Sequence, residues 1–381
     1  MDDETAATLS RWRRHLHAHP ELSTKECETS AFVAARLAEL GIPFVAGVGG
    51  HGVVATLARP GSERSVALRA DMDALPIPEQ TNLAYASTRR GVMHACGHDG
   101  HTTSLLGAAQ LLARDTGWRG TIRLIFQPAE EGGGGARAML ADGLIERFPF
   151  ERIFAFHNWP GLEAGTVMLH PGPVMAAGQR FAVTLHGKAG HAALPHLAKD
   201  PMVAAGHLLL ALQSIVSRNV SPLEPAVLTV GMIEAGNAPN QIPETATLRG
   251  TFRTYRREVH ELIGAAVRRI ADGVAATFGM TAEVSMTLIG AATVNTKEEA
   301  DRAAAAAASA GLAVRRDLEP SMTGEDFAWY LQKRPGAFAW IGNGPNEGGR
   351  DLHSPHYDFN DAILPAAASY LAAAARAALA E

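Results

Sequence analysis

Acidic residues and a histidine follow three short apolar runs that are typical of buried β-strands. Asp71 and Asp73 come after SVALRA, Glu130 and Glu131 follow TIRLIF, and His157 follows RIFAF. The carboxyl ends of the strands in an open α/β sheet line the ligand crevice, so we expect these side chains to converge. A cluster of this composition is either a metal site or a site of proton transfer.

The segment CGHDGH and a late histidine add a thiol and imidazoles to this group. Cys96 and His98 precede an expected helix, and Gly97 between them lets the backbone turn sharply enough to aim both side chains at one point. His353 lies in a loop after AFAWIG. One thiolate, three imidazoles and one carboxylate make five ligands, one more than the four of a closed zinc site. The sequence therefore predicts two ions, about 3.5 to 4 Å apart, that share a water.

The adjacent pair Glu130 and Glu131 provides two carboxylates with different tasks. Neighbouring side chains on an extended or turning backbone point in different directions, so one carboxylate can bind metal while the other acts as a base. A base beside the shared water would take its proton and later deliver it to the leaving amine. Water attack on an amide bond requires these parts.

Each of these residues has an ordinary structural explanation when it is taken singly. His157 or His353 could be a hydrogen-bonded core histidine, and Cys96 could be a plain buried thiol. Glu130 and Glu131 could open a helix, where the helix dipole favours negative charge. Their conjunction at the ends of four expected strands favours the metal interpretation.

The elements that must position these residues predict an α/β fold with a mainly parallel sheet. Helices are expected at about 5–17, 26–40, 102–113 and 298–310, with an amphipathic closing helix at 365–380. Strands are expected at 52–57, 65–70, 121–126, 152–156 and 337–341.

The middle of the chain has a different order of expected helices and strands. A strand, a helix, two strands, a long helix and a last strand are expected between about 180 and 288, and this βαββαβ order is that of the ferredoxin-like motif. We therefore expect a metal-binding catalytic domain at 1–178 and 291–381, interrupted by a satellite domain at 179–290. The exposed strand edges of such a domain make dimerisation plausible.

Composition narrows the class of protein. The 381 residues include 34 basic and 39 acidic side chains, without a dense basic stretch, which argues against a nucleic-acid partner. No run approaches the roughly 20 apolar residues of a membrane helix, and the acidic N-terminus does not resemble a secretory signal. Cys27 and Cys96 are the two cysteines, which fits a reducing compartment. We expect a cytoplasmic enzyme of small molecules.

The ordered motifs closely resemble the M20 metallopeptidase family over nearly the whole chain. The resemblance is to its amidohydrolase branch, which includes hippurate hydrolases, N-acyl amino acid amidohydrolases and auxin-conjugate hydrolases. The motifs are LHAHPELS, RADMDALP, MHACGHDGH, FQPAEEGGGGA, HGKAGHAALPH, NQIPE, GTFRT, TGEDFA and LHSPHYDFN.

The resemblance implies a zinc-peptidase-like catalytic domain with a general base at Glu130. It implies metal ligands at Cys96, His98, Glu131, His157 and His353. Asp71 stands where the wider family has a histidine ligand, and Cys96 would compensate. Asp73 is expected to orient a ligand rather than to bind metal.

The resemblance also assigns residues of the inserted domain. His191 would stabilise the oxyanion of the tetrahedral intermediate, in its own or in the partner subunit of a homodimer. Asn240 and Arg253 would hold the substrate carboxylate, for which arginine is suited. Asn240 could instead only shape a turn before Pro243, and Arg253 could be an exposed cation. His17 and His19 could cap a helix, and the Thr323 to Asp326 stretch reads as a helix start.

The predicted activity is hydrolysis of the amide bond of an N-acyl amino acid by metal-activated water. Manganese or zinc is expected, with cobalt and nickel as alternatives, because mixed thiolate, imidazole and carboxylate ligands suit all four. An aminopeptidase or dipeptidase acting on free-amine peptides would share the metals but need a carboxylate for the substrate ammonium. A non-catalytic metal- or ligand-binding protein is the alternative from another class.

Overall fold

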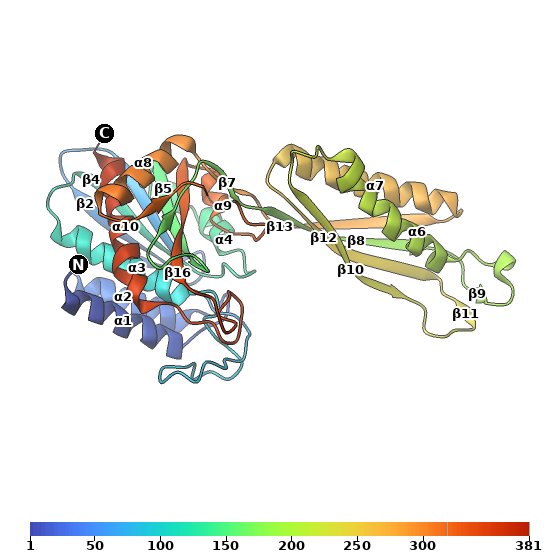
Figure 1. Ribbon diagram of the computed structural model, residues 1–381, viewed down its shortest axis with the longest axis horizontal. Coiled ribbons are helices and arrows are strands. Elements are labelled where there is room, and N and C mark those ends of the chain that lie inside the picture. The colour runs from blue at the N-terminus through green and yellow to red at the C-terminus, as the bar shows by residue number, and fades with distance from the viewer. Residues whose placement is uncertain (318, 381) are drawn as a thin grey trace. The chain divides into compact units, whose positions relative to one another are not determined.

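The computed structural model describes residues 1–317 and 319–380, which form two compact units (Figure 1). The first unit contains Met1–Val174, Val294–Glu319 and Asp326–Glu381, and the second contains Met175–Thr293 and Pro320–Glu325. The insert expected at 179–290 lies inside the second unit. That unit also includes Pro320–Glu325, which the sequence predicts to lie in the catalytic domain.

An eight-stranded sheet in the order β1-β2-β4-β3-β5-β16-β6-β15 forms the centre of the first unit. Its strands are β1 (Phe44–Val48), β2 (Gly52–Arg59), β3 (Ser65–Asp71), β4 (Gly120–Gln127), β5 (Arg152–Pro160), β6 (Val167–Met168), β15 (Val314–Arg315) and β16 (Gly336–Gly344). The four central strands β4, β3, β5 and β16 pair in parallel, whereas β1 and β2 are antiparallel additions at one side. Burial on both faces explains why the central strands are nearly continuous apolar runs.

Helices cover this sheet and close its core. They are α1 (Asp3–Ala18), α2 (Cys27–Glu39), α3 (His98–Arg114), α4 (Gly135–Ala141), α5 (Leu144–Arg147), α8 (Lys297–Ser309), α9 (Ala328–Leu331) and α10 (Leu364–Leu379). Helix α3 begins four residues before the expected start at Thr102, so His98 belongs to its first turn rather than to a preceding loop. Short strands β7 (Gly172–Met175) and β14 (Thr293–Asn295) pair with each other.

Helix α10 differs from the amphipathic helix expected at the C-terminus. It packs against α3, α8 and the sheet, and most of its residues from Leu364 to Leu379 are buried. The stretch Asp361–Leu379 is long and apolar enough to cross a membrane, but 67% of its most apolar window is buried inside the protein. A buried core helix passes the same test, and a cytoplasmic location stays a prediction.

The second unit has the ferredoxin-like arrangement. Its antiparallel sheet has the order β10-β12-β8-β13 and consists of β8 (Ala177–His186), β10 (Ala226–Ala235), β12 (Thr245–Thr254) and β13 (Thr281–Gly290). Helices α6 (Pro201–Ser214) and α7 (Arg257–Thr277) lie on one face of it (Figure 1). A small ribbon of β9 (Gly190–His191) and β11 (Gln241–Ile242) completes the unit.

A buried charged network joins α1 to the start of α3. Arg13 is fully buried and contacts Asp361 (Nε to Oδ1, 2.5 Å), Asp358 (Nη1 to Oδ1, 3.0 Å) and Asp99 (Nη1 to Oδ2, 3.8 Å). The His17 ring contacts the same Asp99 carboxylate through Nδ1 at 2.8 Å. His17 is therefore a buried ion-pair partner and not a helix cap. The network holds Asp99, which is the neighbour of His98 in the chain.

The charged partners of His17 reverse the effect of its burial. Burial alone lowers the pKa of the imidazole, but hydrogen bonds to Asp99 and Glu79 raise it to about 9. A histidine with an ordinary pKa of 6.5 in the unfolded chain then stabilises the fold fully below pH 6.5, and this contribution is lost as the pH rises through 9. The shift corresponds to about 3 kcal/mol.

Replacing His17 with glutamine should therefore remove a pH dependence of stability. Between about pH 6 and pH 9.5, the parent should lose up to about 3 kcal/mol more of its free energy of unfolding than His17→Gln does. Urea titrations of metal-free protein at the two pH values measure this difference. His19→Gln is the matched control, because the His19 ring hydrogen-bonds to the backbone carbonyl of His15 and, among the described residues, to no carboxylate. Equal pH dependence in the parent and His17→Gln would contradict the assigned ion pair.

Candidate metal centre

The four central parallel strands end at one edge of the sheet, where the predicted site residues gather. Asp71 is the last residue of β3, and Glu130 and Glu131 follow β4. His157 lies within β5, which continues to Pro160, and the loop after β16 leads to His353. The backbone N–H of His353 donates to the carbonyl of Ala95 (2.8 Å), which ties this loop to the CGHDGH segment.

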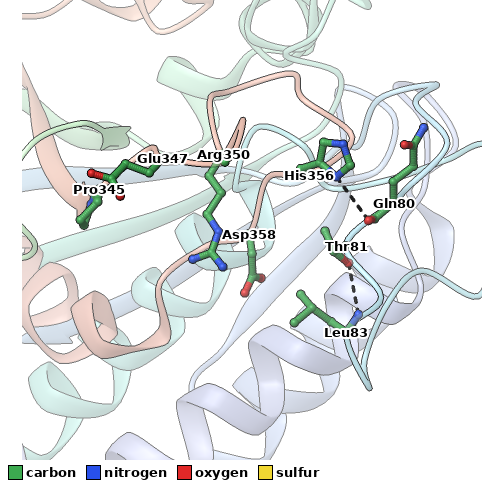
Figure 2. A pocket seen from close by; sticks show the side chains of 9 residues that line it. Gln80, Thr81, Leu83, Pro345, Glu347, Arg350, His356 and Asp358 are labelled. Carbon is green, nitrogen blue, oxygen red and sulfur yellow. Dashed lines mark hydrogen bonds between the residues drawn. The ribbon is translucent and has the colours of Figure 1, made fainter.

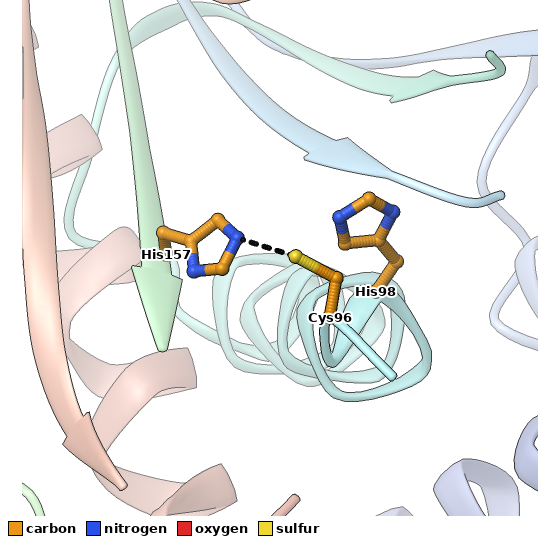
Figure 3. A group of neighbouring side chains, drawn as sticks. All are labelled: Cys96, His98 and His157. Atoms are coloured by element: carbon orange, nitrogen blue, oxygen red, sulfur yellow. Dashed lines mark hydrogen bonds between the residues drawn. The ribbon is translucent and has the colours of Figure 1, made fainter. Parts of the chain in front are cut away.

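Cys96, His98 and His157 form the most buried part of the centre (Figure 3). Their donor atoms lie within 4.8 Å of one another. The Sγ atom of Cys96 is 3.3 Å from Nε2 of His157, and Figure 3 shows the sulfur between the two imidazole rings. Three of the five predicted ligands therefore lie close together.

Two further groups extend the cluster toward solvent. Donor atoms of Cys96, Glu131 and His353 lie within 4.8 Å of one another, as do those of His98, Glu130 and Glu131. His353 Nε2 is 3.3 Å from Glu131 Oε1, and the His353 side chain is 52% exposed. The five predicted ligands and Glu130 therefore form one continuous group.

Two buried atoms in this group have the environment of metal ligands. His98 Nε2 and Glu131 Oε1 make no hydrogen bond to the residues that the structure describes, and they lie 3.8 Å apart. A buried polar atom without a partner costs about 1 to 3 kcal/mol. A cation bound by both atoms would remove this cost, so the donor set fits divalent metal ions.

Hydrogen bonds fix which nitrogen of each ring can face a metal. His157 Nδ1 donates to the backbone carbonyl of Asn158 (2.6 Å), and His98 Nδ1 donates to Asp73 Oδ1 (3.2 Å). Both rings therefore direct an unprotonated Nε2 into the cluster when they are neutral. Asp73 also accepts from Ser23 Oγ (2.6 Å), which holds its carboxylate behind His98.

The protonation of Cys96 and His98 depends on the charges around them. Burial and the nearby Glu131 carboxylate raise the pKa of the Cys96 thiol well above its ordinary value. Burial alone lowers the pKa of His98, but Asp71 and Asp73 together raise it well above the ordinary value. Metal ligands must be deprotonated, so metal binding to this centre releases protons.

Asp71 and His101 lie next to the cluster without an open coordination position. His101 Nδ1 donates to Asp71 Oδ1 (2.6 Å), and His101 Nε2 accepts the backbone N–H of Asn158 (3.0 Å). Arg69 Nη1 donates to the other oxygen of Asp71 at 2.7 Å. Since both ring nitrogens of His101 are used, this group braces the end of β5 rather than forming another metal site.

Sequence reasoning missed two carboxylates that support the Glu130 and Glu131 turn. Asp326 accepts from Gln127 Nε2 and from the Ala136 N–H, both at 2.9 Å, and its own N–H donates to Glu130 Oε1 at 3.1 Å. The sequence predicts a helix start for Thr323 to Asp326, and α9 does begin at Ala328, but the sequence does not predict these contacts of Asp326. Glu26 is the second; it is buried, but it lies in a polar segment that gave no sequence signal of this role.

The predicted substrate residues of the second unit fall into two places. His191 pairs with Gln241 in the β9–β11 ribbon, and Asn240 lies beside it because its carbonyl accepts the Ala192 N–H (3.1 Å). Arg253 lies near the other end of β12, roughly 25 Å of strand away from Thr245. The structure brings His191 and Asn240 together and separates them from Arg253.

A hollow of about 510 Å³ lies beside the loop that contains His353 (Figure 2). Arg350 and Asp358 line one side of it, and His356 lies beside Gln80, whose carbonyl is 3.3 Å from His356 Nδ1. None of the predicted metal ligands lines this hollow.

Comparison with known proteins shows which family this chain resembles. Residues 67–377 match the sequence model of the peptidase family M20/M25/M40. The N-acetyl-L-cysteine deacetylase of Bacillus subtilis is 43% identical over 94% of this chain and 85% of its own length. The hippurate hydrolase of Campylobacter jejuni is 40% identical over 94% of each chain.

A solved structure agrees with the fold and with the kind of centre. The YXEP protein of Bacillus subtilis, a dinuclear metal binding peptidase of the M20 family, superposes with a TM-score of 0.89. It is 37% identical, and the match covers 99% of both chains.

Gly97 between Cys96 and His98 should be required for the metal centre. Its φ is +90°, and a Cβ atom there would collide with the side chains of Asn158 and Tyr357. Asn158 Nδ2 donates to the Cys96 carbonyl (2.7 Å), so the collision would displace the thiol. Gly97→Ala should weaken metal binding by about 10-fold or more, measured by metal content after dialysis against a buffered metal solution.

Gly91→Ala is the control for backbone strain. Gly91 has a φ of +79°, but a Cβ atom there would meet nothing within 4 Å. This variant should lose about 1 to 2 kcal/mol of stability and keep its metal. Equal metal loss in both variants would show that strain, and not the position of the thiol, is responsible.

Proposed function

We propose that this chain, which belongs to the peptidase family M20/M25/M40, is a metal-dependent amidohydrolase that cleaves the amide bond of N-acyl amino acids. The observation that carries the proposal is the convergence of a thiol, three imidazoles and two carboxylates at the ends of four parallel strands. The activities named for relatives at 40 to 43% identity support the substrate class.

Two divalent ions would be held by the five ligands of the cluster. These ligands are Cys96, His98, Glu131, His157 and His353. When bound, such ions lower the pKa of a water molecule and polarise the carbonyl that it attacks. Manganese or zinc is our proposal for the native metal, and cobalt or nickel would suit the same donors.

Glu130 would act as the base. Its Oε1 accepts the Asp326 N–H at 3.1 Å, and the side chain is partly exposed beside the ligand Glu131. Glu130 takes a proton from the attacking water as the new C–O bond forms. It then gives that proton to the amine nitrogen as the C–N bond breaks, which releases the acyl group as a carboxylic acid and the amino acid as a free amine.

The second unit would contribute substrate contacts from two subunits of a homodimer. His191 Nδ1 accepts the Ala193 N–H (3.1 Å), so the neutral ring carries its proton on Nε2 and can donate to an oxyanion. Arg253 and Asn240 lie too far apart on one unit to bind the same small carboxylate. We propose that His191 and Asn240 serve one subunit's substrate and Arg253 serves the other's.

Glutamine variants of the two adjacent glutamates should separate their roles. Glu130→Gln should lower kcat by about 10²- to 10⁴-fold and keep both metal equivalents, because the base is lost but the ligands remain. Glu131→Gln should lose metal. Hydrolysis rates and metal content measured on the same samples test this assignment. Retention of metal by Glu131→Gln together with its loss from Glu130→Gln would reverse the roles.

Removal and return of metal should switch the activity off and on. Chelator-treated protein should be inactive, and manganese or zinc should restore cleavage of hippurate, N-acetyl amino acids or an indoleacetyl amino acid. A dipeptide with a free amine completes the panel, and release of the amino acid is measured. Cleavage of the dipeptide alone would assign the chain to the aminopeptidases, and inactivity on the whole panel with metal bound would contradict the proposal.

A further inference from the structure

We propose that Glu26 is a positioning residue that holds the turn from Gln127 to Ala136 and so directs Glu130 toward the substrate. The inference rests on the proposed role of Glu130 as the base. Glu26 belongs to the segment before α2, about 100 residues from the turn in sequence, and it does not belong to the cluster of metal-ligand atoms. Its effect on the reaction would pass through the backbone of the turn.

Direct hydrogen bonds tie Glu26 to the residue before Glu130. Glu26 is fully buried, and its Oε1 accepts the backbone N–H of Ala129 at 2.7 Å and that of Thr24 at 3.0 Å. The backbone carbonyl of Ala129 accepts the Gly135 N–H at 3.0 Å. Glu26 thereby holds the N–H of Ala129, and Gly135 at the other end of the turn holds its carbonyl.

Ala129 needs such support because of its backbone conformation. Its φ is +55°, in the left-handed region, which is strained for a residue with a Cβ atom. Without the Glu26 contact, rotation of Ala129 toward an ordinary φ would relieve this strain. That rotation would swing Glu130, the next residue, away from its present direction.

Glu26 is one of three buried carboxylates that grip the same turn. Asp73 accepts the Glu131 N–H and Asp326 accepts the Ala136 N–H, both at 2.9 Å. Glu26, Asp73 and Asp326 come from three separate segments of the chain and hold the backbone before, within and after the two glutamates. We call these three residues the carboxylate clamp.

Stability alone does not account for a glutamate at this position. Glu26 Oε2 is buried and forms no hydrogen bond within the described part of the chain, and a buried polar atom of this kind costs free energy. Burial and the charge of Asp73 act against the ionised form. The proposed role of Glu26 in positioning Glu130 would explain why a carboxylate is buried here at this cost.

Hydrogen–deuterium exchange of the metal-free protein tests the mechanical part of the proposal. Glu26→Ala should increase exchange in the peptide that covers 128–136. Glu26→Gln should leave it near the parent level, because the amide oxygen can accept the same two N–H groups. Glu26→Asp, whose shorter side chain cannot reach Ala129, is the second loss variant should the alanine variant fail to fold.

Glu21→Ala is the matched control. Glu21 is also buried and accepts the Thr29 N–H (2.8 Å) with its carboxylate, but this carboxylate does not contact the turn. The control should lose stability in a urea titration and keep the exchange of 128–136 unchanged. It removes the same kind of hydrogen bond from the same part of the fold.

The kinetic part uses metal-loaded enzyme and the best substrate of the panel. Glu26→Ala and Glu26→Asp should lower kcat by about 10- to 100-fold, with KM within about threefold of the parent and two metal equivalents retained. Glu26→Gln should restore kcat to within about threefold of the parent. Loss of kcat in Glu21→Ala equal to that in Glu26→Ala would overturn the proposal, because it would reflect general destabilisation.

The exchange readout separates this inference from the proposed function. Failure of the parent to hydrolyse any panel member would overturn the amidohydrolase assignment, whereas the exchange experiment would still report whether Glu26 holds the turn. Increased exchange with unchanged kcat would make Glu26 a structural residue only. Unchanged exchange in both loss variants would also overturn the positioning role.

Discussion

The parallel pairing of β4, β3, β5 and β16 is the constraint on which the centre depends. Parallel strands end at the same edge, so residues from four distant parts of the chain meet there. The apolar interior of these strands stabilises the pairing, and the polar residues begin where the buried runs end. The apolar part of each strand thus stabilises the fold, and the residues near its carboxyl end form the candidate centre.

The polar residues at that edge are held in place by hydrogen bonds and ion pairs to residues outside the ligand cluster. The Arg13 network holds Asp99 beside His98, the Asp71–His101 pair holds the backbone after His157, and the carboxylate clamp holds the two glutamates. Each support satisfies buried polar atoms and leaves ligand atoms such as His98 Nε2 directed into the cluster. Preorganisation of this kind lowers the cost of ordering the ligands when a metal binds.

The length of one strand in the ferredoxin-like unit separates the residues that we propose as substrate contacts. β12 spans Thr245–Thr254, with Arg253 near its end and the His191 ribbon beyond its start. A single small substrate cannot contact both ends of a strand of this length. This geometry supports the proposal that two subunits contribute to each site, since the catalytic unit by itself contains the ligand cluster and Glu130.

The sequence by itself determined the α/β class, the ferredoxin-like order of the insert, the family and the group of ligand candidates, because apolar runs and motif spacing are local properties. It misplaced the start of α3 at Thr102, treated α10 as amphipathic, and explained His17 and Asp326 as helix-end residues. Their actual partners, Asp99 for His17 and the Glu130 turn for Asp326, lie about 80 and 200 positions away. Only the tertiary structure decided these pairings and the separation of Arg253 from Asn240, because burial and charge pairing depend on which distant segments pack together.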